Sequence, residues 1–378
     1  MKSAHGLVIG KFYPPHDGHH FLVRTAAAVC ERVSVIVMAA SHEGLSLDKR
    51  MAWMAEVHCD LPNVQVLGIV DDVPVDYKDP AIWRQHVALM QEALRGSDAG
   101  PITSVFTSET YGAELARHFD ATPVTLDPAR DNFPISGTLV RRDPVRYWRH
   151  LAAPVRGGLA QRVVVVGAES TGTTTLSLAL ADYWRRQGPP HHETRWIGEY
   201  GRAFTVEKLA QARAMAQLER KPAPGMKELV WTTDEFVHIA KVQTAWEEEA
   251  ARLGGPLLIC DTDALATEIW HERYLGSEAP AVREIADSRV PALYIVTDHE
   301  GVPFEQDGVR DGEHIRAWMT GRFMEVLKAR GLNHILVAGP PMARLENAIQ
   351  VTAALFARSW PQLTDTVPMA VDQARDAG

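Results

Sequence analysis

The sequence predicts an α/β protein built from two doubly wound parallel-sheet domains. A short apolar strand, a glycine-containing loop and a helix follow one another twice, with the strands at residues 7–9 and 163–166. Continuously apolar strands are typical of parallel sheets that are covered on both faces. After each opening, further apolar strands alternate with helical patterns, as in doubly wound sheets. The length of 378 residues also fits two domains.

The expected elements follow in chain order. In the first domain we expect further strands at residues 34–39, 64–70, 104–107 and 123–126, and helices through residues 21–29, 49–57, 82–94, 113–118 and 141–148. In the second domain we expect strands at residues 257–260, 292–296 and 335–337, again separated by helices. The predicted domains are residues 1–152 and 162–358. The segment 153–161, with its proline and paired glycines, is a linker, and the polar tail 359–378 is disordered.

Composition excludes several classes of protein. Lys plus Arg number 39 and Asp plus Glu number 48, so the net charge is −9 and the chain has no global field for nucleic acid or an anionic membrane. An apolar run long enough for membrane insertion does not occur in the sequence. Cys30, Cys59 and Cys260 are scattered, which disfavours a disulfide framework and a zinc ribbon. We therefore expect a cytoplasmic protein that binds no nucleic acid.

The first loop, residues 10–19, reads GKFYPPHDGH and leads directly into a helix. Two imidazoles and a lysine at a helix N-terminus suit an anion, because the free N–H groups and the helix dipole lie there. The alternatives are histidines that only cap and pack, or a zinc site at His16 and His20, for which no further ligand is evident nearby. The candidate catalytic residues are Lys11, His16 and His19, together with Arg141 farther along the domain. Gly10, Phe12 and Gly18 are candidate nucleotide-binding residues.

A second element of the same domain reads ISGTLVR at residues 135–141. Ser136 and Thr138 fit the start of a helix, where hydroxyls meet free N–H groups, and Arg141 projects one turn later. An ordinary capped helix with a solvated arginine is the alternative when this element is taken alone. Its occurrence in one domain with the histidine loop favours a phosphate site.

Together the two elements resemble the HxGH nucleotidyltransferase superfamily, whose domains are Rossmann-like. The resemblance implies attack by a substrate phosphate on the α-phosphate of ATP, with release of pyrophosphate. It implies that His16 and His19 stabilise the α-phosphate in the transition state and that Lys11 neutralises developing charge. Ser136, Thr138 and Arg141 would then hold the leaving pyrophosphate.

The second loop, GAESTGTT at residues 167–174, has the spacing and the strand–loop–helix context of a P-loop. Thr173 occupies the position of the usual lysine, so the point charge between the β- and γ-phosphates is missing. Backbone N–H groups can still surround the phosphates. The candidate nucleotide-binding residues are Gly167, Glu169, Ser170, Thr171, Gly172, Thr173, Thr174 and Thr175.

Further polar residues complete this second candidate site. Thr174 and the carboxylates at the end of the strand 257–260, Asp261 and Asp263, are candidate Mg²⁺ ligands, although two such carboxylates also commonly cap a helix. The polar segment 302–311 has the character of a lid, and Arg310 or Arg316 could partly replace the lysine. Residues 199–202 (EYGR) could face an acceptor.

The order of the two domains resembles the NadR type of bifunctional enzyme, over about residues 1–345. That resemblance implies NAD salvage: a kinase domain phosphorylates nicotinamide riboside with ATP, and the adenylyltransferase domain joins nicotinamide mononucleotide to AMP, with Mg²⁺ accompanying ATP. It also implies a homo-oligomer and a functional link to a nicotinamide riboside transporter. Some members carry an N-terminal helix-turn-helix, and because the first strand begins at residue 7 we expect none here.

Two alternatives stay open. The lysine-less domain could be a regulatory module that binds nucleotide without chemistry. Alternatively, the first domain could use another acceptor, such as phosphopantetheine or a flavin mononucleotide, although flavin adenylyltransferases are usually fused to a barrel-type kinase.

Overall fold

The computed structural model describes residues 2–76, 78–95, 97, 100–306, 310, 312–357, 360 and 363–364. The chain divides into two compact units, with the boundary between Val155 and Arg156. Each unit contains a five-stranded parallel sheet, which confirms the predicted fold class. In the described part of the chain, no helix combines the length and the apolar character needed to cross a membrane.

The sheet of unit 1 has the strand order β3-β2-β1-β4-β5. Its strands are β1 (Ser3–Gly10), β2 (Cys30–Ala39), β3 (Val64–Val70), β4 (Ser104–Thr107) and β5 (Thr122–Thr125). Its helices are α1 (Asp17–Val29), α2 (Leu47–Val57), α3 (Pro80–Leu94), α4 (Gly112–His118) and α5 (Gly137–Arg142), with the short η1 (Trp148–His150). The chain adds β2 and β3 on one side of β1 and then β4 and β5 on the other. The loop after β1 therefore lies where the strand order reverses, which is where open α/β sheets bind ligands.

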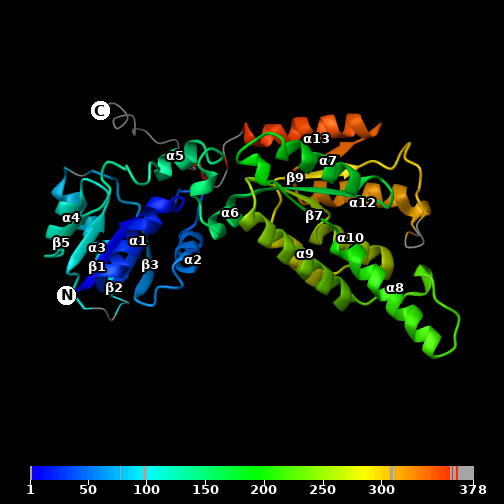
Figure 1. The fold of residues 1–378 in the computed structure, drawn as a ribbon, viewed down its shortest axis with the longest axis horizontal. Helices are drawn as coiled ribbons and strands as arrows, with labels where there is room; N and C mark the ends of the chain where they lie inside the picture. Colours follow the sequence, from blue (N-terminus) through cyan, green and yellow to red (C-terminus); the bar gives the residue numbers. More distant parts are fainter. Residues whose placement is uncertain are drawn as a thin grey trace. The chain divides into compact units, whose positions relative to one another are not determined.

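Successive residues of β1 face opposite layers, as the apolar pattern predicted. Val8 packs with Leu22 and Ala26 of α1, whereas Leu7 packs with Trp83 of α3 and Leu115 of α4. Helices thus cover both faces of the sheet (Figure 1). This burial holds the β1–α1 loop at the carboxyl edge of a rigid sheet.

Unit 2 repeats the arrangement, with the strand order β10-β9-β6-β8-β7. Its strands are β6 (Gln161–Gly167), β7 (Arg195–Ile197), β8 (Leu257–Asp261), β9 (Leu293–Thr297) and β10 (His334–Val337). Its helices are α7 (Thr173–Arg185), α8 (Tyr200–Leu218), α9 (Thr233–Leu253), α10 (Ala264–Leu275), α11 (Pro280–Asp287), α12 (Arg316–Ala329) and α13 (Pro341–Phe356), with the short η2 (His191–Glu193), η3 (Met226–Glu228) and η4 (Glu313–Ile315). Helices α7 and α13 share a core with the sheet, and α9 packs against β7 and β8 (Figure 1).

Two predicted segments differ in the structure. The predicted helix over 141–148 is wrong in its limits: α5 begins at Gly137 and ends at Arg142. The residue before a proline is disfavoured in helical geometry, so the helix stops at Asp143, before Pro144. The predicted linker 153–161 contains the helix α6 (Ala153–Leu159). Its glycine at 157 reflects close packing, because a Cβ there would lie 2.8 Å from atoms of Glu248 and Arg252.

The predicted disordered tail is described at only a few residues. Trp360 and Leu363 are buried. Residues 358–359, 361–362 and 365–378 lie outside the described residues, as do residues 307–309 and 311 of the predicted lid.

Candidate active sites

The two predicted histidines lie together at the start of α1. Their rings stack with centroids 3.7 Å apart, and the rings of Phe12 and His19 meet edge to face with centroids 4.9 Å apart. The backbone N–H of His16 donates to Nδ1 of His19 over 3.3 Å. Because Nδ1 of His19 accepts this bond, the neutral ring carries its proton on Nε2 and can donate it to a ligand.

Both imidazoles are held in the neutral form. Burial lowers the pKa of His19 to about 3, with the nearby guanidinium of Arg130 adding to the shift. Burial also lowers the pKa of His16 well below its ordinary value, and the neighbouring His19 and His20 add to this effect. Nδ1 of His16 is buried without a hydrogen-bond partner in the described structure. The site therefore offers hydrogen bonds from neutral rings at a helix N-terminus, which suits an anion.

Lys11 is fixed by a buried carboxylate that sequence reasoning missed. Its Nζ lies 2.9 Å from Oε1 of Glu43, whose Oε2 accepts from Arg50 at 2.6 Å. Arg50 is fully buried, and it also donates to the carbonyl of Lys11. Burial alone would raise the pKa of Glu43, but Lys11 and Arg50 lower it overall, so the carboxylate stays ionised. Glu43 thereby sets the position of the Lys11 ammonium.

Helix α5 brings the second predicted element to the first. Nη1 of Arg141 donates to the carbonyl of Tyr13 over 2.8 Å, and its guanidinium lies over the Tyr13 ring. Ser136 is the N-cap of α5 and accepts from the N–H of Leu139. Arg141 also reaches Oγ1 of Thr138 at 3.3 Å. Residues 136, 138 and 141 are thus gathered beside the loop that carries the histidines.

Glycines permit this close packing. A Cβ at Gly137 would lie 2.9 Å from the carbonyl oxygen of Tyr13, and one at Gly18 would lie 3.3 Å from the His16 ring. Gly10 ends β1, and a Cβ there would lie 3.3 Å from the Phe12 ring. Side chains at these positions would push apart the elements that form the site.

Arg130 is a further cation that the sequence reasoning missed. It lies in the loop before α5 with a positive φ of 58°, and Oε1 of Glu109 binds its Nη2 at 3.0 Å. Its charge lowers the pKa of both His16 and His19. The only sequence signal for it is its place a few residues before the ISGTLVR element.

The zinc alternative finds no support from neighbouring ligands. His20 bonds to His58 at 3.1 Å between ring nitrogens, and burial lowers the pKa values of these rings to about 3 and about 4. Across the described residues, no group of three or more His, Cys, Asp or Glu side chains could hold a metal ion.

The second candidate site is the loop between β6 and α7. Gly172 has a φ of 84° and Ser170 a φ of 59°, which gives the loop its tight turn before α7. Oγ1 of Thr171 is buried and bonds to the carbonyl of Ala168 and to Oγ1 of Thr297. A Cβ at Gly167 would overlap Thr297. The loop thus packs on the end of β9 and leaves its opposite side for a ligand.

The predicted metal ligands separate in the structure. Oγ1 of Thr174 donates to Oδ2 of Asp261 at 2.5 Å, and burial raises the pKa of that carboxyl. Asp263 instead caps α10: its Oδ1 accepts from the N–H of Ala266 and its Oδ2 from the hydroxyl of Tyr294. Asp261 is therefore beside the P-loop threonine, whereas Asp263 serves the structure of α10.

A cavity opens in front of this loop. Among its lining residues are Gly167, Glu169, Ser170, Thr173, Thr174 and Arg310 of the predicted site. Aromatic rings from α9, α10 and the segment before α9 line it as well: Trp231, Phe236, Trp270 and Tyr274. The spacing of Trp270 and Tyr274, one helical turn apart after Asp261, is the sequence signal that could have found them. The other predicted residues of this site do not line the cavity: Thr171, Gly172, Thr175, Asp261 and Asp263.

Glu199 is a half-buried carboxylate that lines the same cavity. It stands at the N-cap of α8, within the EYGR segment. Burial, with the nearby Asp261 carboxylate adding to it, raises the pKa of Glu199 to about 7. A carboxylate with such a pKa can accept a proton from a substrate hydroxyl near neutral pH.

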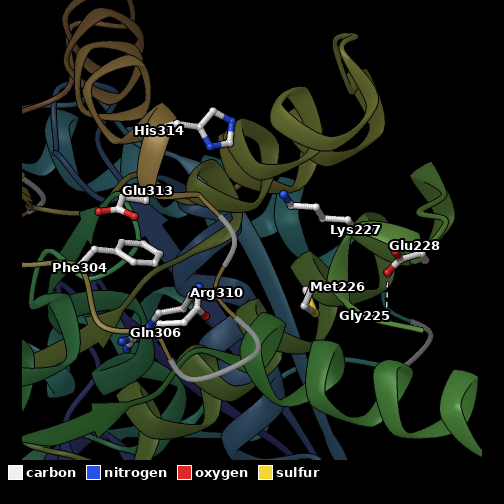
Figure 2. A pocket seen from close by; sticks show the side chains of 9 residues that line it. All are labelled: Gly225, Met226, Lys227, Glu228, Phe304, Gln306, Arg310, Glu313 and His314. Carbon is white, nitrogen blue, oxygen red and sulfur yellow. Dashed lines mark hydrogen bonds between the residues drawn. The ribbon is translucent and has the colours of Figure 1, made fainter. Parts of the chain in front are cut away.

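The predicted lid residues take different roles. Arg310 lines the cavity and pairs with Glu305 at 3.1 Å. It also lines an outer cavity, into which Lys227 of η3 projects (Figure 2). The facing residues of this cavity are Phe304, Gln306, Glu313 and His314. Both oxygens of Glu169 are engaged, one by Arg273 and one by the N–H of Gly312. Arg316 is directed at backbone carbonyls behind the P-loop rather than at the cavity.

Comparisons with known proteins match the second unit by itself and also most of the chain as a whole. A family model described as AAA domain matches residues 162–344. Over 323 residues the chain is 24% identical to the "Trifunctional NAD biosynthesis/regulator protein NadR" of Escherichia coli (strain K12), covering 82% of this chain and 72% of that protein. The protein of the same name from Salmonella typhimurium is 23% identical, covering 88% of this chain and 78% of that protein. This chain is NadR-like.

Solved NadR structures share the fold of this NadR-like chain. A crystal structure of NadR protein in complex with NR has a TM-score of 0.70 at 19% identity and covers 94% of this chain and 96% of that chain. One in complex with NAD and AMP-PNP has a TM-score of 0.69 at 21% identity, with 95% and 97% covered. At these identities the likeness bears on the fold, and function has to be argued from the sites.

Proposed function

We propose that unit 1 transfers the AMP moiety of ATP to nicotinamide mononucleotide, which yields NAD and pyrophosphate. The observation that carries this proposal is the meeting of two elements on one loop. The stacked neutral imidazoles of His16 and His19 begin α1, and Arg141 of α5 bonds to the carbonyl of Tyr13 in the same loop. Proteins named for NAD biosynthesis among the relatives support the choice of acceptor.

The chemistry requires positioning and charge stabilisation, because the substrate phosphate is itself the nucleophile. The Nε2–H of His19 and the ring of His16 would donate to the α-phosphate as negative charge accumulates there. Lys11, fixed by Glu43, would neutralise the bridging oxygen as it leaves. Ser136, Thr138 and Arg141 would hold the pyrophosphate.

We further propose that unit 2 phosphorylates nicotinamide riboside with ATP, so that its product becomes the substrate of unit 1. The cavity combines a P-loop with four aromatic rings, and aromatic faces attract a cationic pyridinium ring. Glu199 would accept the proton of the attacking ribose hydroxyl. The ligands of the solved relatives support this assignment: NR in one structure, and NAD with AMP-PNP in another.

A magnesium ion fits the proposed kinase site. Mg²⁺ is usually bound by one or two protein oxygens together with substrate phosphates and water. The adjacent oxygens of Thr174 and Asp261 provide such a pair, and a cation would offset the burial of the Asp261 carboxylate. When bound with ATP, the ion would supply charge stabilisation of the transferred phosphoryl group. Asp263 is left out of this role, because both of its oxygens are engaged in capping α10 and binding Tyr294.

The alternative for unit 2 is a regulatory module that binds nucleotide without phosphoryl transfer, and Thr173 in place of lysine favours it. One experiment separates the two. The purified full chain is given MgATP with either nicotinamide riboside or nicotinamide mononucleotide, and both products are followed by chromatography. NAD from both substrates supports two activities in series. NAD from the mononucleotide alone supports the regulatory alternative, and NAD from neither refutes the adenylyltransferase.

A further inference from the structure

Two buried arginines bind the backbone of the lysine-less P-loop from behind. Nη1 of Arg344, on α13, donates to the carbonyl of Thr171 over 3.0 Å, and its Nε donates to the carbonyl of Gly339 over 2.7 Å. Arg316, at the start of α12, donates to the carbonyls of Ser170 at 3.4 Å and Val302 at 2.9 Å. Two consecutive peptide groups of the loop are thus held by guanidinium groups from two different helices.

The charge on these arginines is poorly compensated. Arg344 is 5% exposed and Arg316 is 8% exposed. In the described part of the chain neither forms an ion pair, and Nη2 of Arg344 and Nε of Arg316 are buried without a hydrogen-bond partner. Burial lowers the pKa of Arg344, against the influence of Asp298, which raises it. A buried cation that no ion pair compensates is costly, so an anion bound nearby would stabilise this arrangement.

The geometry of the peptide unit decides where the N–H groups of the P-loop point relative to the two arginines. In a trans peptide the N–H points opposite to the C=O. The carbonyls of Ser170 and Thr171 point to the arginines, so the N–H groups of Thr171 and Gly172 point away from them. Neither N–H has a hydrogen-bond acceptor among the described residues. A cation on the carbonyl also polarises the peptide group and strengthens its N–H as a donor.

We propose that Arg344, assisted by Arg316, is a positioning residue that performs part of the work of the missing P-loop lysine. It holds the N–H groups of Thr171 and Gly172 toward the terminal phosphates of a nucleoside triphosphate and supplies positive charge from behind the loop. Because Arg344 also binds Gly339, it connects the loops that follow β6 and β10 at the ligand edge of the sheet. This inference rests on the proposed kinase function.

The test compares Arg344→Gln with a matched variant, Arg322→Gln, on the full chain. Arg322 forms ion pairs with Glu272 and Glu325 and does not contact the P-loop in the structure. We expect Arg344→Gln to lower kcat/KM for ATP in the phosphorylation of nicotinamide riboside by about 10- to 100-fold. This corresponds to the loss of one hydrogen bond from a charged donor. The KM for nicotinamide riboside and the activity of Arg322→Gln should stay near wild type. Equal kinetics of the two variants would overturn the inference.

Rescue by a new lysine distinguishes an electrostatic role from a packing role. Thr173→Lys places an ammonium group in the loop, so its gain in kcat/KM should be at least about fivefold larger in the Arg344→Gln background than in wild type. Equal gains in the two backgrounds would mean that Arg344 only packs. Arg344→Lys keeps the charge but cannot bind the carbonyls of Thr171 and Gly339 as the guanidinium does. This variant should lose less kinase activity than Arg344→Gln. An equal loss would likewise contradict an electrostatic role.

A wild-type chain that transfers no phosphate would refute the kinase without deciding the role of Arg344. AMP-PNP binding to the full chain, measured by calorimetry and resolved into two sites, then provides the test. Arg344→Gln should weaken about tenfold the site whose affinity Thr173→Lys increases, in line with one charged hydrogen bond. Unchanged affinity at that site would overturn the inference.

Discussion

Among single residues, His19 has the most clearly defined role. Its Nδ1 accepts from the backbone N–H of His16, so its Nε2–H remains for a ligand. We expect His19→Ala to lower NAD formation from nicotinamide mononucleotide by about 100- to 1,000-fold, the usual cost of removing one preorganised donor. The measurement is kcat with both substrates saturating. His118→Ala, at the end of α4, is the matched control and should keep wild-type activity. Turnover of His19→Ala within tenfold of wild type would contradict the assignment.

Glu199 gives the proposed kinase a predictable pH dependence. Its pKa of about 7 means that the carboxyl is protonated in acid and becomes an acceptor as the pH rises through 7. The kinase kcat should therefore rise with pH between about 6 and 8. Glu199→Gln, which cannot ionise, should flatten this profile and lower the rate. A Glu199→Gln profile with the wild-type slope would show that another group titrates.

At the residue scale, the sequence was informative where one short segment carries several functional groups. His16, His19 and Lys11 lie within one loop, so their proximity follows from chain connectivity. Glu43 and Arg130 were missed because they reach the loop from segments far away in the sequence. The aromatic rings around the second cavity were missed for the same reason, since Trp231 and Trp270 come together only in the folded unit.

Among the elements, α5 depends on Gly137 for its close packing against the loop that carries His16 and His19. Gly137→Ala would place a Cβ 2.9 Å from the carbonyl oxygen of Tyr13, so α5 must shift and Arg141 must lose its bond to that oxygen. We expect adenylyl transfer to fall at least about tenfold, because sub-ångström misplacement of binding groups is costly. Kinase activity of the same variant should be unchanged.

Gly321→Ala provides the matched control for that change. Gly321 lies inside α12 with nothing within 4 Å of an added Cβ, so alanine should stabilise the helix by up to about 1 kcal/mol. Both activities should stay at wild-type level. Retained adenylyl transfer in Gly137→Ala, measured beside this control, would show that α5 need not touch the loop.

The prediction of elements succeeded where the pattern was apolar and continuous, as in β1, β6 and β8. It failed at the end of α5. The helix ends before Pro144, as the local conformational preference of the residue before a proline requires, whereas the prediction extended it to residue 148. The paired glycines in residues 153–161 predicted a linker. The boundary between the two units lies inside this segment, which forms α6, and Gly157 lies close to α9. Asp263 as a metal ligand stays a prediction, but its contact with Tyr294, from a distant strand, could not be predicted from the sequence.

For the whole molecule, each unit carries its own candidate site, so damage to one should spare the other. Arg310 lines the cavity of unit 2. Arg310→Ala should therefore slow formation of nicotinamide mononucleotide about tenfold or more, as expected for the loss of a charged phosphate contact. NAD formation from added nicotinamide mononucleotide should not change. Equal loss of both activities would refute independent sites.

The two units should also respond to acid in opposite directions. In unit 1, the pKa values of His19 and His20 are lowered to about 3 and that of His58 to about 4. Below pH 6.5 the unfolded chain binds protons that the folded unit does not, so the stability of unit 1 falls as the pH falls. In unit 2, burial raises the pKa values of Glu199 and Glu247 to about 7 and about 8, with Asp261 and Asp263 respectively adding to the shifts. Between pH 4.5 and 7 the folded unit retains protons that the unfolded chain releases, so unit 2 becomes more stable as the pH falls.

Calorimetry of the full chain at pH 7.5 and pH 5.5 measures this difference. Each buried histidine or glutamate contributes on the order of 1 kcal/mol per pH unit, which corresponds to a shift of a few degrees in the melting temperature. The lowered pKa of His191 opposes the effect in unit 2, but two glutamates outweigh one histidine. The transitions are assigned by adding nicotinamide mononucleotide or nicotinamide riboside, each of which should raise the melting temperature of the unit that binds it. At pH 5.5 the transition of unit 1 should move down and that of unit 2 up, and movement of both in one direction would contradict the buried histidine and glutamate assignments.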